Sequence, residues 1–340
     1  YGARFRSEYH HAFGLSHGSR RGTDVLFIRL ERNGVKGFGE VALPPYLSEN
    51  IEDAWQVLRG TEVREALTQG AGPPDLVAYP ATRAALSMAW VDLHAREQGV
   101  SLHRALDLPP PEGAKAMMTI AGCALEELPE RVKALHQEAA VIKLKLTGTD
   151  DVERVRTVLA MDARPVFLDV NQGWRSIDQA LELFRAVGTE RVVGLEQPFP
   201  ASAWTLHEEL KRETSTVPLF ADESFQGLGD LDQVCRAFDG VNIKLAKCGG
   251  IDRAMEIARN ANGRDLRVML GSMSEGALGC AAAWQLSGLA DLCDLDGPWL
   301  IRNDPFQGFR MVGGVYEVDD GPGLNVSTVH ELNWALLAHN

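Results

Sequence analysis

Short apolar runs alternate with helix-length segments through the last two thirds of the chain. Eight runs follow one another: "AMMTIAG", "AVIKLKL", "PVFLDV", "VVGLEQP", "VPLFADE", "VNIKLAK", "RVMLGS" and "LCDLDGP". Strands that alternate with helices at this spacing indicate parallel βαβ units. Eight units favour a closed barrel over the alternative, an open doubly wound sheet.

The first third of the chain has a different pattern. Residues 24–43 contain two strand-like runs joined at Asn33 and Gly34, a dipeptide typical of two-residue hairpin turns. Apolar positions at helical spacing follow over residues 81–99. Strands followed by a helix predict an α+β unit here.

A Pro- and Gly-rich segment over residues 108–114 separates the two patterns. We therefore predict an N-terminal α+β domain over residues 1–112 and a barrel domain over residues 113–309. We expect the C-terminal segment, 310–340, to join the N-terminal domain.

Composition narrows the choice of partner. The chain has 340 residues, 45% of them hydrophobic, and a formal net charge of -13. A field of that sign argues against binding to nucleic acid or to an anionic membrane surface and leaves a small polar ligand as the better partner. Five cysteines without a CxxC pair predict neither a disulfide framework nor a zinc ribbon, and they favour the cytoplasm.

Three acids stand at the ends of consecutive apolar runs. Asp169 ends the third run, Glu196 the fourth and Asp222 the fifth. The carboxyl ends of barrel strands share one rim, where such folds carry their chemistry. One strand-end acid is usually a helix cap, but three clustered carboxylates would repel one another unless a hard cation lay among them. The pattern predicts an ion such as Mg²⁺.

Lysines lie in two otherwise apolar runs. The second run contains Lys143 and Lys145, and the sixth contains Lys244. In an eight-stranded ring these two strands face each other, so the lysines flank the acids from opposite sides. A partly desolvated lysine can serve as a general base, and this placement predicts proton abstraction beside a carboxylate. Lys247, nearer a turn, is better interpreted as the partner of a buried acid.

Five segments together resemble the muconate-lactonising subgroup of the enolase superfamily, over nearly the whole chain. They are "KLK" (143–145), "DVNQGW" (169–174), "EQP" (196–198), "ADES" (221–224) and "NIKLAKCGG" (242–250). The combination is specific, although each segment alone is weak.

The resemblance implies an α+β capping domain over a modified TIM barrel of the (β/α)7β type, with one Mg²⁺ in each active site. It also implies removal of a proton α to a carboxylate to give an enolate. By the same resemblance the metal ligands are Asp169, Glu196 and Asp222, the acid/base pair is Lys145 and Lys244, and Lys143 supports Lys145.

The eighth run distinguishes members of this subgroup. Asp294 and Asp296 are two residues apart and so share one face of the last strand. They resemble the pair with which dipeptide epimerases hold the α-ammonium group of the substrate. Ser272 and Met273 resemble the seventh-strand segment of that family, where we expect a shaping role. The implied function is Mg²⁺-dependent epimerisation at the α-carbon of a dipeptide's C-terminal residue, an isomerase reaction.

Two segments of the N-terminal domain, 14–22 and 43–50, correspond to loops that close over the substrate in this family. Arg20 follows a serine, much as the glutamate-binding arginine does in some L-Ala-D/L-Glu epimerases. We therefore expect L-Ala-L-Glu as the substrate. Tyr46 and Leu47 offer an apolar pocket instead, which would favour apolar dipeptides.

Other functions stay open or are disfavoured. N-acylamino acid racemases, o-succinylbenzoate synthases and cycloisomerases of the same subgroup remain alternatives. A protein that binds a metal and a peptide without turnover would have no use for lysines on both sides. Residues 14–18, "GLSHG", match GxSxG but lack a preceding strand and a following helix, so a serine hydrolase is disfavoured. The sequence leaves a homo-oligomer open.

Overall fold

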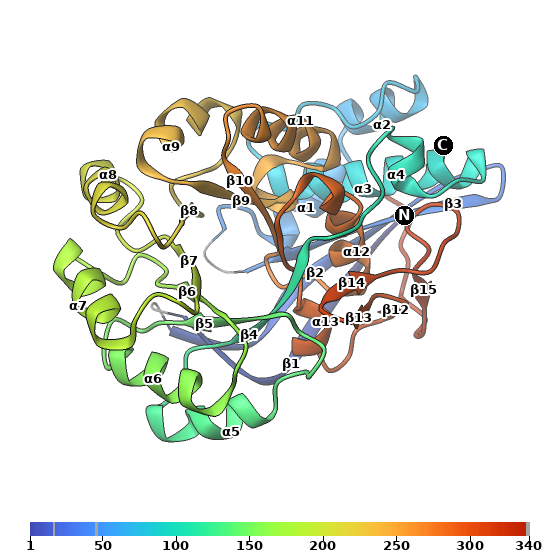
Figure 1. Ribbon diagram of the computed structural model, residues 1–340. Coiled ribbons are helices and arrows are strands. Elements are labelled where there is room, and N and C mark those ends of the chain that lie inside the picture. The colour runs from blue at the N-terminus through green and yellow to red at the C-terminus, as the bar shows by residue number, and fades with distance from the viewer. Residues whose placement is uncertain (16–17, 45–46, 338–340) are drawn as a thin grey trace.

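The structure is a computed structural model that describes residues 1–15, 18–44 and 47–337 (Figure 1). Eight parallel strands form a closed barrel, because the last strand pairs with the first through Leu292 opposite Lys115 and Cys293 opposite Ala116. The predicted barrel is therefore confirmed. Its strands are β4 (Lys115–Ile120), β5 (Val141–Lys145), β6 (Val166–Asp169), β7 (Val192–Glu196), β8 (Leu219–Ala221), β9 (Gly240–Lys244), β10 (Arg267–Gly271) and β11 (Leu292–Asp294).

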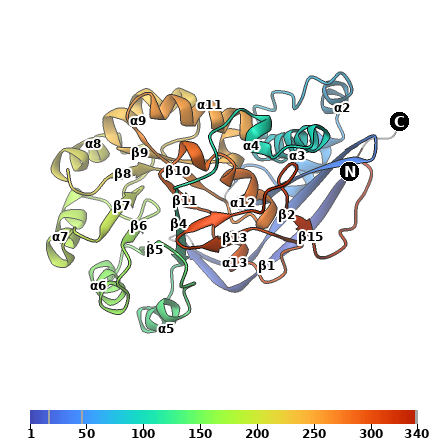
Figure 2. The ribbon, with the colours of Figure 1, turned by 45° about the vertical axis from the view of Figure 1, so that its right-hand side comes forward.

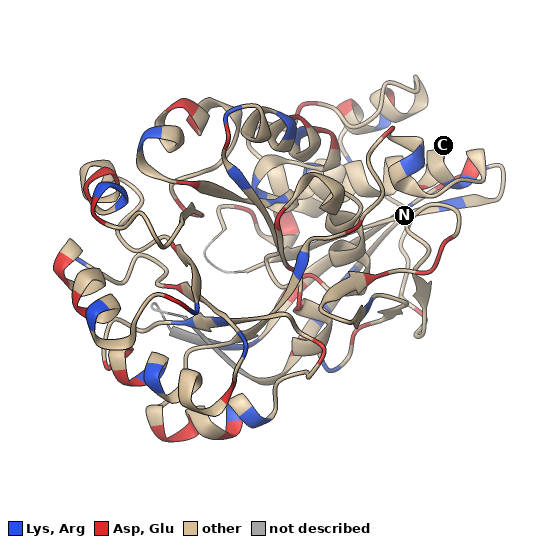
Figure 3. Ribbon diagram, viewed as in Figure 1, with Lys and Arg blue, Asp and Glu red and all other residues tan. Residues whose placement is uncertain are grey.

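Helices follow the barrel strands and cover the outside of the ring (Figure 1). Charged residues are spread over these outer helices (Figure 3). None of the described helices is long and apolar enough to cross a lipid bilayer. The helices are α5 (Leu128–Lys133), α6 (Asp151–Met161), α7 (Ile177–Val187), α8 (Trp204–Glu213), α9 (Leu231–Ala237), α10 (Leu245–Cys248), α11 (Ile251–Asn262), α12 (Ala277–Trp284) and α13 (Gly297–Leu300), with short 3-10 turns at Leu125–Glu127, Leu228–Asp230 and Ser287–Leu289.

The barrel interior has an apolar layer beneath a charged one. The apolar layer consists of Met117, Val141, Phe167, Phe220, Met269 and Leu292. Alternate residues of a strand share a face, so the positions two residues further on also point inward: Lys143, Asp169, Asp222 and Asp294. Gly194 leaves room for the apolar layer, since a Cβ there would lie 2.3 Å from the ring of Phe167. The charged layer therefore rests on a packed floor.

The N-terminal unit is an antiparallel sheet packed against helices, to one side of the barrel (Figure 2). Asn33 (φ 52°) and Gly34 (φ 81°) form the predicted hairpin turn, with both residues in the left-handed region that a type I′ turn requires. The elements are β1 (Gly2–Leu15), β2 (Gly18–Arg32), β3 (Val35–Leu43), α1 (Ile51–Leu58), α2 (Thr61–Thr68), α3 (Pro80–Gln98) and α4 (Leu102–Ala105).

The segment expected as a loop over residues 14–22 is mostly strand, which corrects that prediction. Gly14 pairs with Ser19, and Gly22 pairs with Glu8, so β1 and β2 form one long hairpin. The chain continues as a strand beyond the GxSxG serine, whereas a nucleophile elbow needs a helix there. Ser16 itself lies outside the described residues.

The C-terminal segment contacts both units. It contains β13 (Arg310–Val312), β14 (Val315–Glu317) and β15 (Ser327–Thr328), and β15 pairs with β12 (Phe306–Gln307), which directly precedes the segment. β14 pairs with barrel strand β4, with Val315 opposite Lys115. Further along, the Gly2 amide in β1 donates to the carbonyl of Ala335 at 2.9 Å. The division into domains at residues 112 and 309 remains our proposal.

Candidate active site

The parallel register of β5, β6 and β7 brings charged side chains to one level of the barrel. Lys145 is opposite Asp169, and Asp169 is opposite Glu196. Glu196 is in turn opposite Phe220 of β8, and Asp222 follows two residues later. These side chains therefore gather at the carboxyl ends of consecutive strands, as predicted, and all four are buried.

Lys143 is the centre of a buried ionic cluster. Its Nζ lies 2.6 Å from Glu196 Oε2, 2.6 Å from Asp294 Oδ2 and 3.1 Å from Asp169 Oδ2. Burial would lower the pKa of this lysine, but the three carboxylates outweigh burial and raise the pKa well above its usual value. Lys143 therefore stays charged.

The two lysines predicted as the acid/base pair come from strands on opposite sides of the barrel, β5 and β9. Lys145 Nζ donates to Asp169 Oδ2 at 2.8 Å and to Asn171 Oδ1 at 2.9 Å. Lys244 Nζ donates to Asp222 Oδ2 at 2.7 Å. Each lysine is thus paired with a different rim carboxylate.

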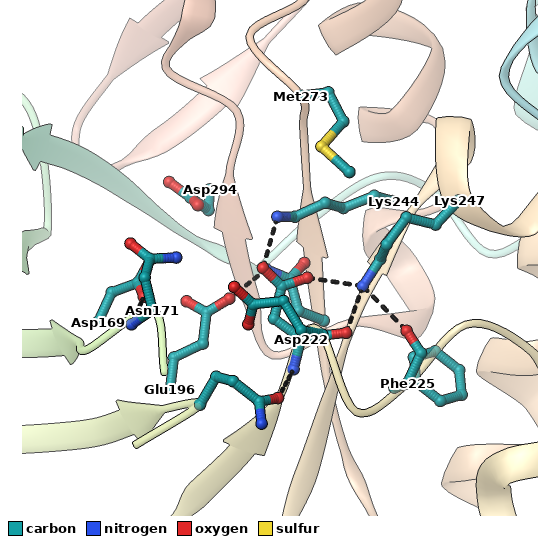
Figure 4. A network of polar contacts seen from close by, with 12 residues as sticks. Asp169, Asn171, Glu196, Asp222, Phe225, Lys244, Lys247, Met273 and Asp294 are labelled. Atoms are coloured by element: carbon teal, nitrogen blue, oxygen red, sulfur yellow. Dashed lines mark hydrogen bonds and ion pairs between the residues drawn. The ribbon is translucent and has the colours of Figure 1, made fainter. Parts of the chain in front are cut away.

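Lys247 holds the other side of Asp222 (Figure 4). Its Nζ lies 2.6 Å from Asp222 Oδ1, 2.7 Å from the Asp222 carbonyl and 3.1 Å from the Phe225 carbonyl. This confirms Lys247 as the partner of a buried acid. Burial would raise the pKa of Asp222, but Lys244 and Lys247 outweigh it and hold the pKa well below its usual range.

The rim carboxylates also repel one another. Burial raises the pKa of Glu196 to about 7, and the charge of Asp169 adds to this rise. Burial would likewise raise the pKa of Asp169, but Lys145 and Lys143 outweigh it and lower the pKa to about 2. Negative charge is thus crowded at this rim, and a cation would relieve it.

The donor set fits a hard divalent cation in its chemistry. Asp169, Glu196 and Asp222 offer carboxylate oxygens, the ligands that Mg²⁺ prefers, from three adjacent strands. Across the described residues, however, no three His, Cys, Asp or Glu side chains are grouped closely enough to hold a metal ion. In this structure, lysine ammonium groups lie between the carboxylates and supply the positive charge.

Both acids predicted on the last strand lie beside the end of the first, but only Asp294 belongs to β11, because that strand ends there and Asp296 directly precedes α13. The amide of Thr119 donates to Asp296 Oδ2 at 2.6 Å, and its hydroxyl donates to Asp294 Oδ1 at 3.3 Å. Burial raises the pKa of Asp296 to about 7, and Asp294 adds to the rise. This pair therefore extends the buried ionic cluster to the last strand, because Asp294 shares Lys143 with Glu196 and Asp169.

A cavity of about 340 Å³ opens over these groups. Nine of the eleven site residues predicted from the sequence line it: Arg20, Lys143, Lys145, Asp222, Lys244, Ser272, Met273, Asp294 and Asp296. The other two, Asp169 and Glu196, each contact Lys143, which forms part of the wall. One cavity therefore unites the predicted residues.

Arg20 reaches the cavity from β2 of the N-terminal unit. Its Nη2 donates to Ser274 Oγ at 3.1 Å and its Nη1 to Thr23 Oγ1 at 3.2 Å, and its guanidinium lies 5.5 Å from the ring centre of Tyr9. Leu47 also lines the cavity. Tyr46, the other residue of the predicted apolar pocket, lies outside the described residues.

Comparisons with known proteins agree with this geometry. Residues 127–331 match the family described as "Enolase C-terminal domain-like". The chain is 32% identical to an L-Ala-D/L-Glu epimerase of Bacteroides thetaiotaomicron, over 94% of this chain and 85% of that protein. The chain belongs to the dipeptide epimerase family of the enolase superfamily.

Other members of the dipeptide epimerase family differ in their substrates. The chain is 29% identical to a hydrophobic dipeptide epimerase of Roseobacter litoralis, over 91% of this chain and 93% of that protein. It also resembles the crystal structure of a dipeptide epimerase from Methylococcus capsulatus complexed with Mg and L-Arg-D-Lys, with a TM-score of 0.84 and 27% identity over 96% of this chain and 98% of that one. Family membership alone therefore does not select a substrate.

Several cavity residues of this epimerase-family chain were not predicted from the sequence. Thr119 is the next-to-last residue of the first barrel strand, a position near the rim that alone would have made it a candidate. Asn171 stands two residues after Asp169, so its contact with Lys145 also had a signal. No signal in the sequence pointed to Ser274, because its φ of 74° and its contact with Arg20 depend on the tertiary fold.

Proposed function

We propose that this chain is a Mg²⁺-dependent epimerase that inverts the α-carbon of the C-terminal residue of a dipeptide. The observation that carries the proposal is the placement of Lys145 and Lys244. They come from opposite sides of the barrel, line the same cavity and each contact a rim carboxylate. A substrate between them presents one face of its α-carbon to each ammonium group.

The two lysines then divide the reaction. One of them, in its neutral form, takes the α-proton, so the C–H bond breaks and an N–H bond forms. The other, in its charged form, gives a proton to the opposite face, so a new C–H bond forms with inverted configuration. The lysines exchange their protonation states in each turnover, and the reverse reaction uses them in reversed roles. Lys143, held charged by three carboxylates, adds positive potential beside Lys145.

Asp169, Glu196 and Asp222 are the residues that would hold the ion. Bound Mg²⁺ would stabilise the negative charge that develops on the substrate carboxylate as the proton leaves. The rim position of the three acids, their oxygen donors and the crowding that raises the pKa of Glu196 support this role. A carboxylate of the substrate placed there has its α-carbon near both lysines.

Asp294 and Asp296 would hold the substrate's α-ammonium group. Both acids line the cavity, and a single dipeptide can reach from them to the lysines because they share that cavity. Substrates without an amine would bring no positive charge to this acid pair beyond that of Lys143 on Asp294. The pair therefore favours dipeptides over N-acylated amino acids within the subgroup.

We propose L-Ala-L-Glu as the preferred substrate because Arg20 lines the cavity of a chain whose net charge is -13. A glutamate side chain would be repelled by the acids of the site unless a cation received it. Leu47 and Met273 line the same cavity and favour a second candidate, a dipeptide with an apolar C-terminal residue.

A panel of L-Ala-L-X dipeptides with Mg²⁺ tests this proposal, with epimerisation followed by chiral chromatography after hydrolysis. We expect the highest kcat/KM for X = Glu. A higher value for Leu or Phe would favour the apolar candidate, and no epimerisation of any dipeptide would contradict the function itself.

The protein's location is also a proposal. Its five cysteines are free thiols, three of them buried, which is typical of proteins kept in a reducing compartment. We therefore propose that it works in the cytoplasm on a small-molecule dipeptide.

A further inference from the structure

A second cavity, of about 250 Å³, adjoins the active-site cavity, and Thr119 and Leu300 line both. We name it the side cavity. Its other walls come from β1, the segment that follows β4, helix α5 and the end of α13. No step of the proposed reaction uses this space.

The acid pair proposed to hold the substrate's ammonium group lies against the shared wall. Both the amide and the hydroxyl of Thr119 donate to this pair, to Asp296 and Asp294 respectively. The α-carbon of an N-terminal residue is one bond away from its ammonium group. Its side chain would therefore begin at the boundary between the two cavities.

The inner part of the side cavity is apolar. Ile120, Leu135, Trp299 and Leu300 contribute to its wall. The methyl group of an N-terminal alanine would fill only a small fraction of about 250 Å³. Apolar walls of this size suit the aliphatic stem of a longer side chain, whose burial is favourable.

The outer part of the side cavity opens into a basic hollow of about 380 Å³. The two spaces share Tyr9, His10, His11, Gly122, Cys123 and Arg131. The hollow adds Arg21 and one acid, Glu127, whose Oε2 lies 3.6 Å from Arg131 Nη2. Two arginines thus face a single carboxylate.

A third arginine lines neither of these two spaces but lies near Cys123, which lines both. Arg154 is 5% exposed, it lies close enough to the Cys123 thiol to affect its titration, and its Nε and Nη1 have no hydrogen-bond partner among the residues that the structure describes. A buried guanidinium without a full set of partners favours a nearby anion. The pKa of His11 is lowered by burial and then by Arg131 and His10, which agrees with a positive environment.

We infer that the side cavity receives the side chain of the substrate's N-terminal residue, and that the arginines at its outer end favour an acidic one. This inference rests on the proposed epimerase function. It predicts substrates with an acid at the N-terminal position, although the curated relative from Bacteroides is named for alanine there.

The test compares three dipeptides that differ only in the N-terminal residue: L-Ala, L-Gln and L-Glu. Their C-terminal residue is the best one found in the L-Ala-L-X panel. Glutamine matches glutamate in shape without its charge. We expect kcat/KM for the glutamate dipeptide to exceed that for the glutamine dipeptide by about threefold or more, the effect of a partly exposed charge pair.

Two variants distinguish the effect of the positive charge at the outer end of the side cavity from the effect of the cavity's size. Arg131→Met should remove the preference for glutamate over glutamine and leave the alanine dipeptide unchanged. Lys133→Met is the matched control, because Lys133 is an exposed cation of the same helix that pairs with Glu130 outside the cavity. Ala134→Phe adds bulk at an exposed position of the cavity wall, and it should slow both longer dipeptides relative to the alanine one.

If the unchanged protein epimerises the alanine dipeptide but has equal kcat/KM for the glutamate and glutamine dipeptides, the inference is overturned and the proposed function stands. An Ala134→Phe variant that slows all three dipeptides equally would also overturn it. If none of the dipeptides is epimerised, the proposed function fails and this inference fails with it.

Discussion

The barrel rim and the N-terminal hairpin both contribute cations to one cavity, but they hold them differently. On the rim, Lys143 is 2% exposed and lies within 3.1 Å of three carboxylates, all fixed by the register of neighbouring strands. On the hairpin, Arg20 is half-buried and donates to two hydroxyl groups, those of Thr23 and Ser274. The rim lysines are matched with carboxylates, whereas Arg20 enters the cavity from another unit and gives hydrogen bonds to the neutral hydroxyl groups of Thr23 and Ser274.

This difference separates the chemistry from the choice of substrate. Charges matched on rigid strands are suited to moving a proton at one fixed point, since their geometry does not depend on the substrate's side chain. A cation that reaches across from another unit is suited to recognising one side chain. Substitutions on the rim should therefore reduce the epimerisation of all substrates alike, and substitutions on the hairpin should reduce that of one substrate.

The largest effect should follow replacement of either opposed lysine. We expect Lys145→Ala and Lys244→Ala to reduce kcat by several orders of magnitude for every dipeptide, because a general acid or base contributes about 10²- to 10⁴-fold and both act in each turnover. Steady-state kinetics on two dipeptides measures this. Lys115→Ala, an exposed lysine at the other end of the barrel, is the control. Near-normal turnover in either rim variant would contradict the assignment.

The next effect concerns the ion. Asp222→Asn should weaken Mg²⁺ binding and remove most of the activity, whereas Glu223→Gln, at the neighbouring residue of the cavity wall, should cost less. Chelation should abolish activity, and added Mg²⁺ should restore it and raise the Tm by mass action.

Activity and thermal unfolding at several Mg²⁺ concentrations check this second prediction. Equal losses in the two variants would mean that Glu223 is also a ligand, and full activity without metal would exclude the metal site.

A smaller, selective effect is expected on the hairpin. Arg20→Ala should raise KM for L-Ala-L-Glu by about tenfold or more, the cost of a lost partly buried charge pair, and leave L-Ala-L-Leu nearly unchanged. The exposed Arg6, which pairs with Asp24 in the same hairpin, provides the control Arg6→Ala. If Arg20→Ala raises KM equally for both dipeptides, the hairpin does not determine substrate choice separately from catalysis on the rim.

The smallest effect concerns stability outside the charged rim. Burial lowers the pKa of His207 on α8 to about 4, from 6.5 when exposed. The folded protein therefore favours the neutral ring. The contribution of His207 to the free energy of unfolding is complete above pH 6.5 and is lost as the pH falls toward 4. It amounts to at most about 3 kcal/mol. Denaturant unfolding between pH 6.5 and 4 should show that the free energy of unfolding falls less for His207→Phe than for the unchanged protein. An equal fall in the two proteins would contradict the role given to His207.

The barrel could be predicted because parallel strands buried on both faces have continuous apolar runs. Each of the eight predicted runs overlaps one strand of the ring, and the Asn33-Gly34 turn follows from local backbone preference. The prediction of a loop over residues 14–22 was wrong. Its glycines and serines have low strand propensity, and the long β1–β2 hairpin depends on pairing that local sequence does not encode.

The candidate site was predictable where chemistry coincides with strand ends. Asp169, Glu196 and Asp222 could be found because a residue at the end of a strand, or directly after it as Asp222 is, reaches the rim in any parallel barrel. The contacts between Thr119 and the acid pair join the first strand to the last, so they exist only after the ring closes. Distant contacts of this kind cannot be derived from local patterns.

Solvent isotope incorporation tests the central claim, proton transfer by opposed lysines, most directly. The best dipeptide of the panel is incubated with the protein and Mg²⁺ in D₂O, and each diastereomer is analysed by mass spectrometry. We expect every inverted product to carry one deuteron at the α-carbon of its C-terminal residue, because the proton is removed on one face and a solvent-derived one is added on the other. Inverted product without deuterium would contradict it.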